Sequence, residues 1–335
     1  MNIVAQSAPD NRVRYSLVIP IYNEEAVLPL LVPRIRALLD RLDGSSEAIF
    51  VDDGSIDTSV IWMREMAAME PRFRLIELSR NFGHQMAITA GMDAARGDAV
   101  VVMDADLQDP PDLVLDLVAK WREGFEIVYA KRVRRDGETR FKRFSASVFY
   151  RLLAKLTSVD VPRDVGDFRL IGRRALETFR QMPERDRFVR GMFAWMGFKQ
   201  AEVLFERPAR AAGETKYPFW KMLRLGVHGI VSFSEQPLRV ALWGGLSICA
   251  FAVCFGAFAI ATKLMGYPTA DGWASTVVLI SLLNGINLFM TGVVGLYVGG
   301  IYAEVKRRPL YVVARDSADG RVAIASEEAP RAAAG

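Results

Sequence analysis

The chain has 335 residues, of which 51% are hydrophobic, and its formal net charge is +4. This length suits one large domain with an additional segment. Two histidines are too few for a histidine-rich metal site. The two cysteines, Cys249 and Cys254, share one apolar segment and indicate neither a disulfide nor a metal pair. Met1–Arg14 contains no signal-peptide core, so we expect the chain to start in the cytoplasm.

Residues 15 to about 130 alternate β-rich runs with helical patterns. Alternation of this kind predicts an α/β domain with a mostly parallel sheet and helices on both faces. The expected strands are Tyr15–Tyr22, Glu47–Asp53, Phe73–Leu78, Ala99–Asp106 and Phe125–Lys131, and the expected helices are Glu24–Leu42, Thr58–Glu70, His84–Arg96 and Pro110–Gly124.

Polar clusters stand at the ends of three expected strands, in Pro20–Glu25, Val51–Ser55 and Met103–Asp109. In a parallel sheet, ligands bind beyond the carboxyl ends of the strands, so these clusters predict a binding site at that edge. The first strand is not followed by a G-x-G-x-x-G pattern, so a dinucleotide site is not supported. The first two clusters would suit ordinary turns equally well.

The third cluster indicates a metal site. If its strand continues, Asp104, Asp106 and Gln108 share one face, because alternate residues of a strand point the same way. Oxygen ligands at this spacing suit Mg²⁺ or Mn²⁺, with water and a substrate phosphate completing the coordination. Asp109 precedes two prolines, and we expect it to cap the N-terminus of the next helix.

Two long stretches near the C-terminus, Val240–Thr262 and Trp273–Ile301, contain no charged residue. Each exceeds the roughly 20 residues needed to cross a bilayer. Two buried core helices are the alternative, although core helices of this length normally show a polar stripe. Basic residues flank the pair at Arg239 and Lys306–Arg308, so we expect both flanks in the cytoplasm and the short connection outside.

Two further segments, Arg140–Leu156 and Tyr217–Phe233, have one apolar and one basic helical face. Beside membrane spans, such helices favour a platform on the membrane surface, with ordinary surface helices as the alternative. Basic clusters in Lys131–Arg143 and Lys306–Arg308 suit phosphates or anionic lipid headgroups. The tail after Arg315 is rich in alanine, glutamate and serine, and we expect it to be disordered.

Seven motifs of the chain, in order, resemble those of one family. They are SLVIPIYNEE, VDDGS, RNFGHQMAITAGMDAARGD, VMDADLQDPPDL, GDFRLIGRRAL, RFVRGMFAWMGF and GETKYPFWKM. On these residues, from about Tyr15 to Val312, the chain resembles the family 2 glycosyltransferases that load sugars onto polyprenyl phosphates. It is similar to bacterial members with a C-terminal pair of membrane helices, such as bactoprenol glucosyltransferases, and to relatives of dolichol-phosphate mannosyltransferases.

The resemblance implies a GT-A (Rossmann-like) catalytic domain, amphipathic juxtamembrane helices and two transmembrane helices. It also implies a multi-pass protein of the bacterial inner membrane, with the catalytic domain and both termini in the cytoplasm. The expected boundaries are an N-terminal arm at 1–14, the catalytic domain at 15–216 with the amphipathic helix 140–156 inserted, a juxtamembrane helix at 217–237, transmembrane helices at 238–264 and 273–301, and a cytoplasmic tail at 302–335.

The resemblance also implies roles for individual residues. The nucleotide sugar would be held by Pro20, Tyr22, Glu24, Asp53 and Asp104. The divalent ion, Mg²⁺ or Mn²⁺, would be held by Asp104, Asp106 and Gln108, and the acceptor phosphate by Arg132, Arg143 and Lys216. Asp167 would face the reaction centre, so the expected catalytic set is Asp104, Asp106, Arg132 and Asp167.

The implied reaction is inverting transfer from a nucleotide sugar, expected to be a UDP-sugar, to a membrane polyprenyl phosphate such as undecaprenyl phosphate. The product would serve the modification of cell-envelope glycans. A phosphate monoester is already anionic near pH 7, its second pKa being about 6. A positioning or electrostatic role for Asp167 is therefore favoured over that of a general base, with a simple turn acid beside Gly166 as the alternative.

Two other functions are weighed against this one. A processive membrane polysaccharide synthase would need more spans to form a channel and a Q-x-x-R-W segment, which RFVRGMFAW lacks. A non-catalytic transporter subunit would leave the acids at the strand ends unexplained. The expected partners are the nucleotide sugar, the lipid phosphate and the membrane. No nucleic acid is expected, and the family suggests a homo-oligomer.

Overall fold

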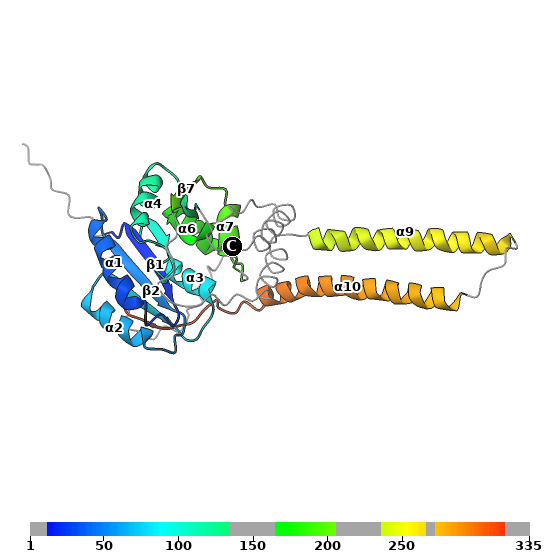
Figure 1. The fold of residues 1–335 in the computed structure, drawn as a ribbon, viewed down its shortest axis with the longest axis horizontal. Helices are drawn as coiled ribbons and strands as arrows, with labels where there is room; N and C mark the ends of the chain where they lie inside the picture. The colour runs from blue at the N-terminus through cyan, green and yellow to red at the C-terminus, as the bar shows by residue number, and fades with distance from the viewer. Residues whose placement is uncertain (1–11, 134–164, 186, 206–235, 266–271, 319–335) are drawn as a thin grey trace, which may run out of the picture. The chain divides into compact units, whose positions relative to one another are not determined.

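The computed structural model describes residues 12–133, 165–185, 187–205, 236–265 and 272–318. These residues divide into two units (Figure 1). The first contains a sheet with helices on both faces and includes residues 308–318 from the end of the chain. The second contains two long helices. The amphipathic helices expected at 140–156 and 217–237 lie outside the described residues, apart from the last two positions.

The first unit is built on one eight-stranded sheet, in the order β7-β5-β6-β4-β1-β2-β3-β8. Strands β1 to β5 are those expected from the sequence. Only β6 and β8 run antiparallel to their neighbours, so the expected α/β class with a mostly parallel sheet is confirmed. The strands are β1 (Tyr15–Ile21), β2 (Ser46–Asp52), β3 (Phe73–Leu78), β4 (Ala99–Val102), β5 (Ile127–Arg132), β6 (Val165–Gly172), β7 (Gln200–Phe205) and β8 (Val313–Asp316).

Helices pack on both faces of this sheet. Helices α1 (Leu28–Arg41), α2 (Ser59–Met69) and α4 (Leu113–Arg122) cover one face, where they share a core with alternate residues of β1. The other face carries α3 (His84–Ala94) and α6 (Arg173–Gln181), and α7 (Val189–Trp195) packs on α6. A Cβ at Gly91 of α3 would lie 2.3 Å from Val18 Cγ1, so the close approach of α3 to β1 requires glycine.

Helix α1 begins at Leu28, four residues later than its expected start at Glu24. The carbonyl of Glu24 accepts hydrogen bonds from the N–H groups of Val27 and Leu28 in a preceding turn. Pro29 then falls in the first turn of the helix, where its missing N–H costs no hydrogen bond. Pro33 lies inside the helix and removes one backbone donor there.

The end of the described chain returns to the sheet as β8, which pairs antiparallel with β3. Arg74 Nε donates to Asp316 Oδ1 at 2.9 Å, and its Nη2 binds the second oxygen of the same carboxylate. The N–H of Ser317 donates to the carbonyl of Leu75, and the N–H of Leu75 donates to Ser317 Oγ, both at 2.9 Å. The sheet edge at β3 is therefore closed by residues from the far end of the sequence.

A further bond ties this segment to α3, because Tyr311 Oη donates to Asp93 Oδ2 at 2.8 Å. We refer to residues 311–318 as the C-terminal strap. The expectation of disorder after Arg315 is wrong for Asp316–Ala318, because strand pairing and a buried ion pair hold these residues on the sheet. Local composition does not reveal such distant partners.

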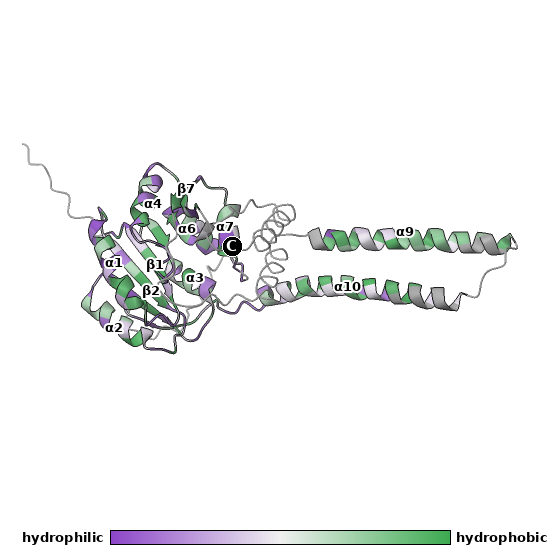
Figure 2. Cartoon of the chain, in the orientation of Figure 1, coloured by the Kyte–Doolittle hydropathy of each residue, from purple (hydrophilic) through white to green (hydrophobic). Residues whose placement is uncertain are grey.

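The second unit contains α9 (Gln236–Leu264) and α10 (Trp273–Val305), which match the expected spans closely. Figure 2 shows both helices as predominantly hydrophobic or neutral along their described length. Their most apolar stretches, Leu238–Phe258 and Leu282–Val305, have mean hydropathies of 2.0 and 1.5, and neither is buried within the described structure. Both helices are long and apolar enough to cross a membrane.

Candidate active site

The loop after β3 is held by two residues at the end of β2. The carboxylate of Asp53 accepts hydrogen bonds from the backbone N–H groups of Phe82 (2.7 Å) and Gly83 (2.9 Å). Gly54 has a φ of +71°, and a Cβ there would lie 2.6 Å from backbone atoms of this loop. Only glycine fits both constraints. The loop leads directly into α3, whose first residue is His84.

Four of the five residues expected to hold the nucleotide sugar lie at the adjoining ends of β1 and β2, and the fifth, Asp104, follows β4. The N–H of Asp53 donates to the carbonyl of Ile21 at 2.9 Å, which joins the two strand ends. Pro20 is buried in β1, Tyr22 is exposed just beyond it, and Glu24 is partly buried. Burial raises the pKa of Asp53, although its two backbone hydrogen bonds oppose the rise. The nucleotide-binding roles of these residues stay predictions.

The third acidic cluster is a turn rather than an extended strand. Strand β4 ends at Val102, and Leu107 has a φ of +59°, which turns the chain. Asp106 Oδ1 accepts the N–H of Gln108 at 3.0 Å within this turn. The expectation that Asp104, Asp106 and Gln108 share one face of a continuing strand is therefore wrong, because these residues lie in a turn beyond the end of β4.

Asp109 shapes this turn. Its Oδ2 accepts the N–H of Asp104 at 3.2 Å, which closes the turn that carries Asp104 and Asp106. Helix α4 begins only at Leu113, with Asp112 at its N-cap position. The expectation that Asp109 caps this helix is therefore wrong. The two prolines after Asp109 have no N–H for its carboxylate to cap.

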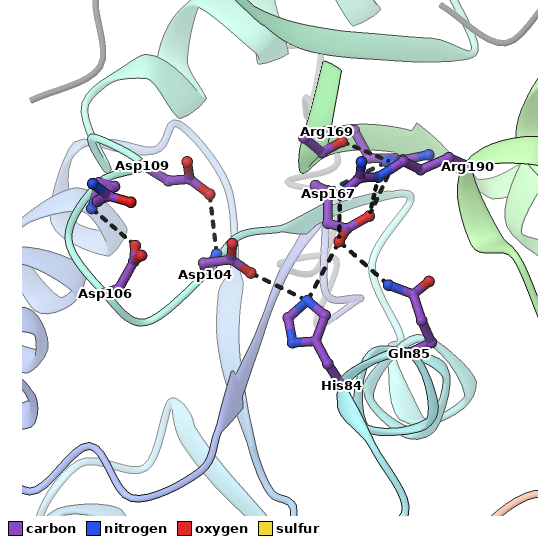
Figure 3. Close-up of polar contacts among 10 residues, drawn as sticks. His84, Gln85, Asp104, Asp106, Asp109, Asp167, Arg169 and Arg190 are labelled. Atoms are coloured by element: carbon purple, nitrogen blue, oxygen red, sulfur yellow. Dashed lines mark hydrogen bonds and ion pairs between the residues drawn. The ribbon is translucent and has the colours of Figure 1, made fainter. Parts of the chain in front are cut away.

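Strand β6 brings a second carboxylate to the same place. It pairs antiparallel with β4, whose last residue, Val102, lies opposite Arg169, and Asp167 precedes Arg169 by two residues on β6. His84 reaches both acids from the N-terminus of α3 (Figure 3). Its Nε2 lies 3.4 Å from Asp104 Oδ1 and 3.4 Å from Asp167 Oδ2. Three elements that are distant in sequence therefore meet at this point.

Asp167 is the most heavily engaged acid of the site. Arg190 Nε donates to Asp167 Oδ1 at 2.9 Å, and Arg190 Nη2 donates to Oδ2 at 3.1 Å (Figure 3). Gln85 Nε2 donates to Oδ2 at 3.3 Å. Arg169, which is fully buried, places its Nη2 3.4 Å from Oδ1. Two arginines thus neutralise a carboxylate that is itself buried.

These contacts shift the pKa values of Asp104 and Asp167 in opposite directions. Burial opposes ionisation of Asp167, but the hydrogen bond from His84 and the charge and hydrogen bonds of Arg190 hold its pKa well below the ordinary value. Burial raises the pKa of Asp104; the charge of His84 opposes this, whereas the charges of Asp167 and Asp106 add to it. Burial would lower the pKa of His84, but its hydrogen bond to Asp167 and the charges of both acids raise it.

The expected phosphate-binding cations are only partly within the described chain. Arg132 ends β5 and is partly buried. A Cβ at Gly166 would lie 3.3 Å from Arg132 Nη2, so this guanidinium stands beside the residue that precedes Asp167. Arg143 and Lys216 lie outside the described residues. The acceptor-binding role of all three cations stays a prediction.

The acids fit a divalent cation. Asp104 Oδ1 is buried and has no hydrogen-bond donor among the described residues, its contact with His84 being an ion pair without hydrogen-bond geometry. A buried carboxylate oxygen in this state suits a metal ligand. No three acidic, histidine or cysteine side chains in the described ranges are grouped closely enough to hold a metal alone.

Four members of the site were assigned no role from the sequence. His84 and Gln85 stand at the start of a helix that follows a parallel strand, a position that could have indicated the site edge. Arg169 and Arg190 come from β6 and α7, neither of which the sequence analysis predicted. Their contacts with Asp167 depend on strand pairing and helix packing, which local patterns do not show.

Comparison with known proteins identifies the family of the chain. The family described as Glycosyl transferase family 2 matches residues 16–180. A glycosyltransferase of Bacillus subtilis, YkcC, is 47% identical over 90% of this chain and 93% of its own length. The prophage bactoprenol glucosyl transferase homolog of Escherichia coli is 37% identical over 90% of this chain and 99% of its own length.

These observations define the class of the protein, which is a glycosyltransferase. The chain belongs to glycosyltransferase family 2. Among solved structures it is similar to Staphylococcus aureus TarS 1-349, with a TM-score of 0.43, 18% identity and coverage of 67% of this chain and 66% of that one. It is also similar to the mannosyltransferase PcManGT from Pyrobaculum calidifontis in complex with GDP-Man and Mn²⁺, with a TM-score of 0.42, 18% identity and coverage of 90% and 89%.

Proposed function

We propose that this glycosyltransferase moves a sugar, with inversion, from a UDP-sugar to a membrane polyprenyl phosphate such as undecaprenyl phosphate. The product is a polyprenyl-phosphate monosaccharide used to modify cell-envelope glycans. Relatives support the acceptor class, because the bactoprenol glucosyl transferases of Shigella phages SfII and SfV are each 37% identical over 90% of this chain.

The observation that most supports a phosphate acceptor is the ionisation state of Asp167. Its carboxylate binds the Arg190 fork and lies against His84, and its pKa is well below the ordinary value, so it is a poor proton acceptor at neutral pH. An alcohol acceptor needs a base to remove its proton. A phosphate monoester, whose second pKa is about 6, already carries the charge with which it attacks.

We assign binding of the nucleotide-sugar donor to the acidic residues at the ends of the strands. Asp104, Asp106 and Gln108 would hold Mg²⁺ or Mn²⁺, and the nucleoside would lie against the residues that end β1 and β2, namely Pro20, Tyr22, Glu24 and Asp53. When bound, the ion acts as a Lewis acid that stabilises the negative charge developing on the departing nucleoside diphosphate. The open oxygen of Asp104 supports this assignment.

The bond changes need no proton transfer. An oxygen of the acceptor phosphate forms a bond to the anomeric carbon as the bond from that carbon to the nucleoside diphosphate breaks. Attack from the opposite face inverts the configuration. Cations must hold the anionic acceptor next to an anionic donor, and we assign this role to Arg132, Arg143 and Lys216.

The lipid acceptor requires a membrane location, which α9 and α10 would provide as transmembrane helices. We place the catalytic domain and both termini in the cytoplasm of a bacterial cell, with the enzyme in the inner membrane. Basic residues flank the helix pair at Arg239 and Lys306–Arg308, and such residues favour the cytoplasmic side.

Radiolabel transfer tests this function. The full chain in nanodiscs that contain undecaprenyl phosphate is incubated with Mg²⁺ and a panel of labelled nucleotide sugars, and the products are partitioned between organic solvent and water. We expect label in the organic phase, as one sugar on one lipid phosphate by mass spectrometry. Ethanol-insoluble label would indicate a polysaccharide synthase, and absence of any product with every donor would contradict transfer to this lipid.

A further inference from the structure

The Arg190–Asp167 pair has a geometry that fixes orientation. Both bonds run between the two nitrogens of one guanidinium edge and the two oxygens of one carboxylate, at 2.9 and 3.1 Å. Such a fork holds the carboxylate plane, whereas a single hydrogen bond leaves it free to rotate. Arg190 is one-third exposed on α7, and Asp167 is only 6% exposed on β6. The pair therefore connects a helix at the surface to a buried acid.

We propose that Arg190 is a positioning residue for sugar transfer, because it fixes Asp167 so that this carboxylate holds His84 and Gln85 beside Asp104. The proposal rests on the proposed function and adds a residue to which neither the sequence motifs nor the relatives assign a role. In this arrangement Arg190 fixes the orientation of Asp167, and Asp167 in turn holds the side chains of the first turn of α3.

The contacts on Asp167 Oδ2 support this order of action. This one oxygen accepts from Arg190 Nη2 and Gln85 Nε2 and lies 3.4 Å from His84 Nε2. Rotation of the carboxylate would move Oδ2 away from the two α3 side chains. His84 lies equally close to Asp104 Oδ1, so a displaced imidazole would change the surroundings of the expected metal ligand.

We do not expect loss of the Arg190 side chain to unfold the site. Arg169 is fully buried beside Asp167 and stays as its counter-charge, with further bonds from its side chain to the carbonyls of Gly166 (3.0 Å) and Asp167 (3.3 Å). Removal of Arg190 would thus loosen the orientation of the carboxylate without leaving its charge unpaired. An effect of losing Arg190 on the orientation of Asp167 can therefore be distinguished from an effect on protein stability.

The position of the His84 imidazole can be tested by NMR, without a measurement of enzyme activity. The chain has only two histidines, His84 and His228. In the full chain labelled with ¹⁵N-histidine, the two imidazoles are distinguished by the variant His228→Gln. We expect Arg190→Gln to shift the His84 imidazole signals and Asp167→Asn to shift them in a similar way. The matched control is Arg174→Gln, which removes an arginine whose side chain is 78% exposed, and it should shift neither signal.

Kinetics on the same variants test the consequence for transfer. We expect Arg190→Gln to lower kcat by about tenfold to a hundredfold, as for loss of a charge-assisted interaction, with little change in either KM. Arg190→Lys keeps the charge but lacks the fork, so it should stay impaired. The double variant with Asp167→Asn should be no slower than Asp167→Asn alone, since both remove one coupled unit.

The outcomes separate the possible failures. Unchanged His84 signals in Arg190→Gln would overturn the positioning role, whether or not the reaction has been identified. A raised KM for either substrate, or a double variant slower than Asp167→Asn, would make Arg190 a direct substrate contact and also overturn it. If the wild-type chain forms no lipid-linked sugar but Arg190→Gln still shifts His84, the proposed acceptor fails and the positioning stands.

Discussion

Asp104 follows the end of β4 and Asp167 lies near the start of β6. Both carboxylates lie 3.4 Å from His84 Nε2, but their other contacts differ. Asp167 is surrounded by donors and stays ionised without a ligand. Asp104 keeps a buried oxygen that no donor satisfies in the described residues. A bound cation would remove the cost of burying that charge. The unsatisfied acid is thus suited to bind a substrate complex, and the satisfied one to hold its neighbours in place.

Asp106→Asn tests the metal site. The change keeps an oxygen that can accept the N–H of Gln108 but removes the charge. We expect transfer to fall by about a hundredfold or more, because charge stabilisation by a bound ion is worth several kcal/mol. Mn²⁺ affinity, followed by electron paramagnetic resonance, should fall in parallel, while circular dichroism stays unchanged. Asp112→Asn, at an exposed acid nearby, should alter neither property. Full transfer by the wild type in metal-free buffer with a chelator would contradict this site.

The substitution Gly54→Ala tests whether the close contact at Gly54 holds the loop after β3 in place. A Cβ at Gly54 would meet backbone atoms at 2.6 Å, in addition to the cost of a φ of +71°. Gly124 is the matched control, with a φ of +94° and no atom within 4 Å of a Cβ. We expect Gly124→Ala to cost about 1–2 kcal/mol of unfolding free energy from the backbone alone. Gly54→Ala should cost about 1–3 kcal/mol more, as for an overpacked site. Equal thermal stabilities of the two variants would show that the loop can move away.

The site was predictable where its chemistry is local in sequence. Asp104 and Asp106 stand two residues apart after an apolar strand, and this spacing, together with the polar ends of two other strands, predicted a metal site. The contact of Arg190 with Asp167 joins residues 23 apart, and that of Gln85 with Asp167 joins residues 82 apart. Neither contact leaves a periodic signal, because the first depends on how α7 packs beside β6 and the second on how α3 packs beside β6.

At the scale of elements, the C-terminal strap completes the sheet beside β3. It contacts β3 through Arg74 and α3 through Asp93, and these two elements flank the loop that leads to His84. Burial alone would raise the pKa of Asp316, but the hydrogen bonds and charge of Arg74 lower it below the ordinary value. Ionised Asp316 therefore stabilises the attachment of the strap.

The strap should make stability depend on pH. Because the pKa of Asp316 is lower in the folded protein, its contribution is present above the unfolded pKa of about 3.9 and is lost as pH falls through the folded value. Asp316→Asn should lower Tm at pH 7, and the difference from the wild type should narrow below about pH 4. Asp98→Asn removes a more exposed ion pair with Arg12 and should have little effect at either pH. A Tm difference for Asp316→Asn that stays constant with pH would contradict the ion pair.

The first five strands follow from alternation of apolar runs and helical patterns, and the structure confirms them, although β4 ends at Val102 and not at Asp106. Strands β6, β7 and β8 were not predicted, because each pairs with strands that are far away in the sequence. β8 is only four residues long, and its strongest contact, between Asp316 and Arg74, joins residues 242 apart. Edge and inserted strands of this kind are specified by partners rather than by their own sequence.

At the scale of the whole molecule, both ends of the helix pair connect to the same unit. The chain leaves the sheet after β7, passes through α9 and α10, and returns as the strap. If both helices cross a membrane, an even number of crossings returns the chain to its starting side. Pairing of β8 with β3 requires that return, so the strap supports the proposed topology independently of the flanking charges.

Cysteine labelling tests this topology. With Cys249 and Cys254 replaced by serine, a single cysteine at Thr269, in the connection between the helices, should react with a membrane-impermeant maleimide in intact spheroplasts. A cysteine at Glu65, an exposed residue of α2, should react only after permeabilisation of the inner membrane. The reverse pattern would place the catalytic domain outside the cell.

The pairing of Lys131 with Val165 joins the points where residues 133–164 leave and re-enter the sheet. The two ends of that segment are therefore fixed as neighbours, whatever its length or composition. Because its flanking residues lie on paired strands, we expect that the segment can be exchanged between relatives while the pairing of β5 with β6 is kept. If Arg143 binds the acceptor phosphate as proposed, such an exchange would change the acceptor contacts and keep the acids at the strand ends.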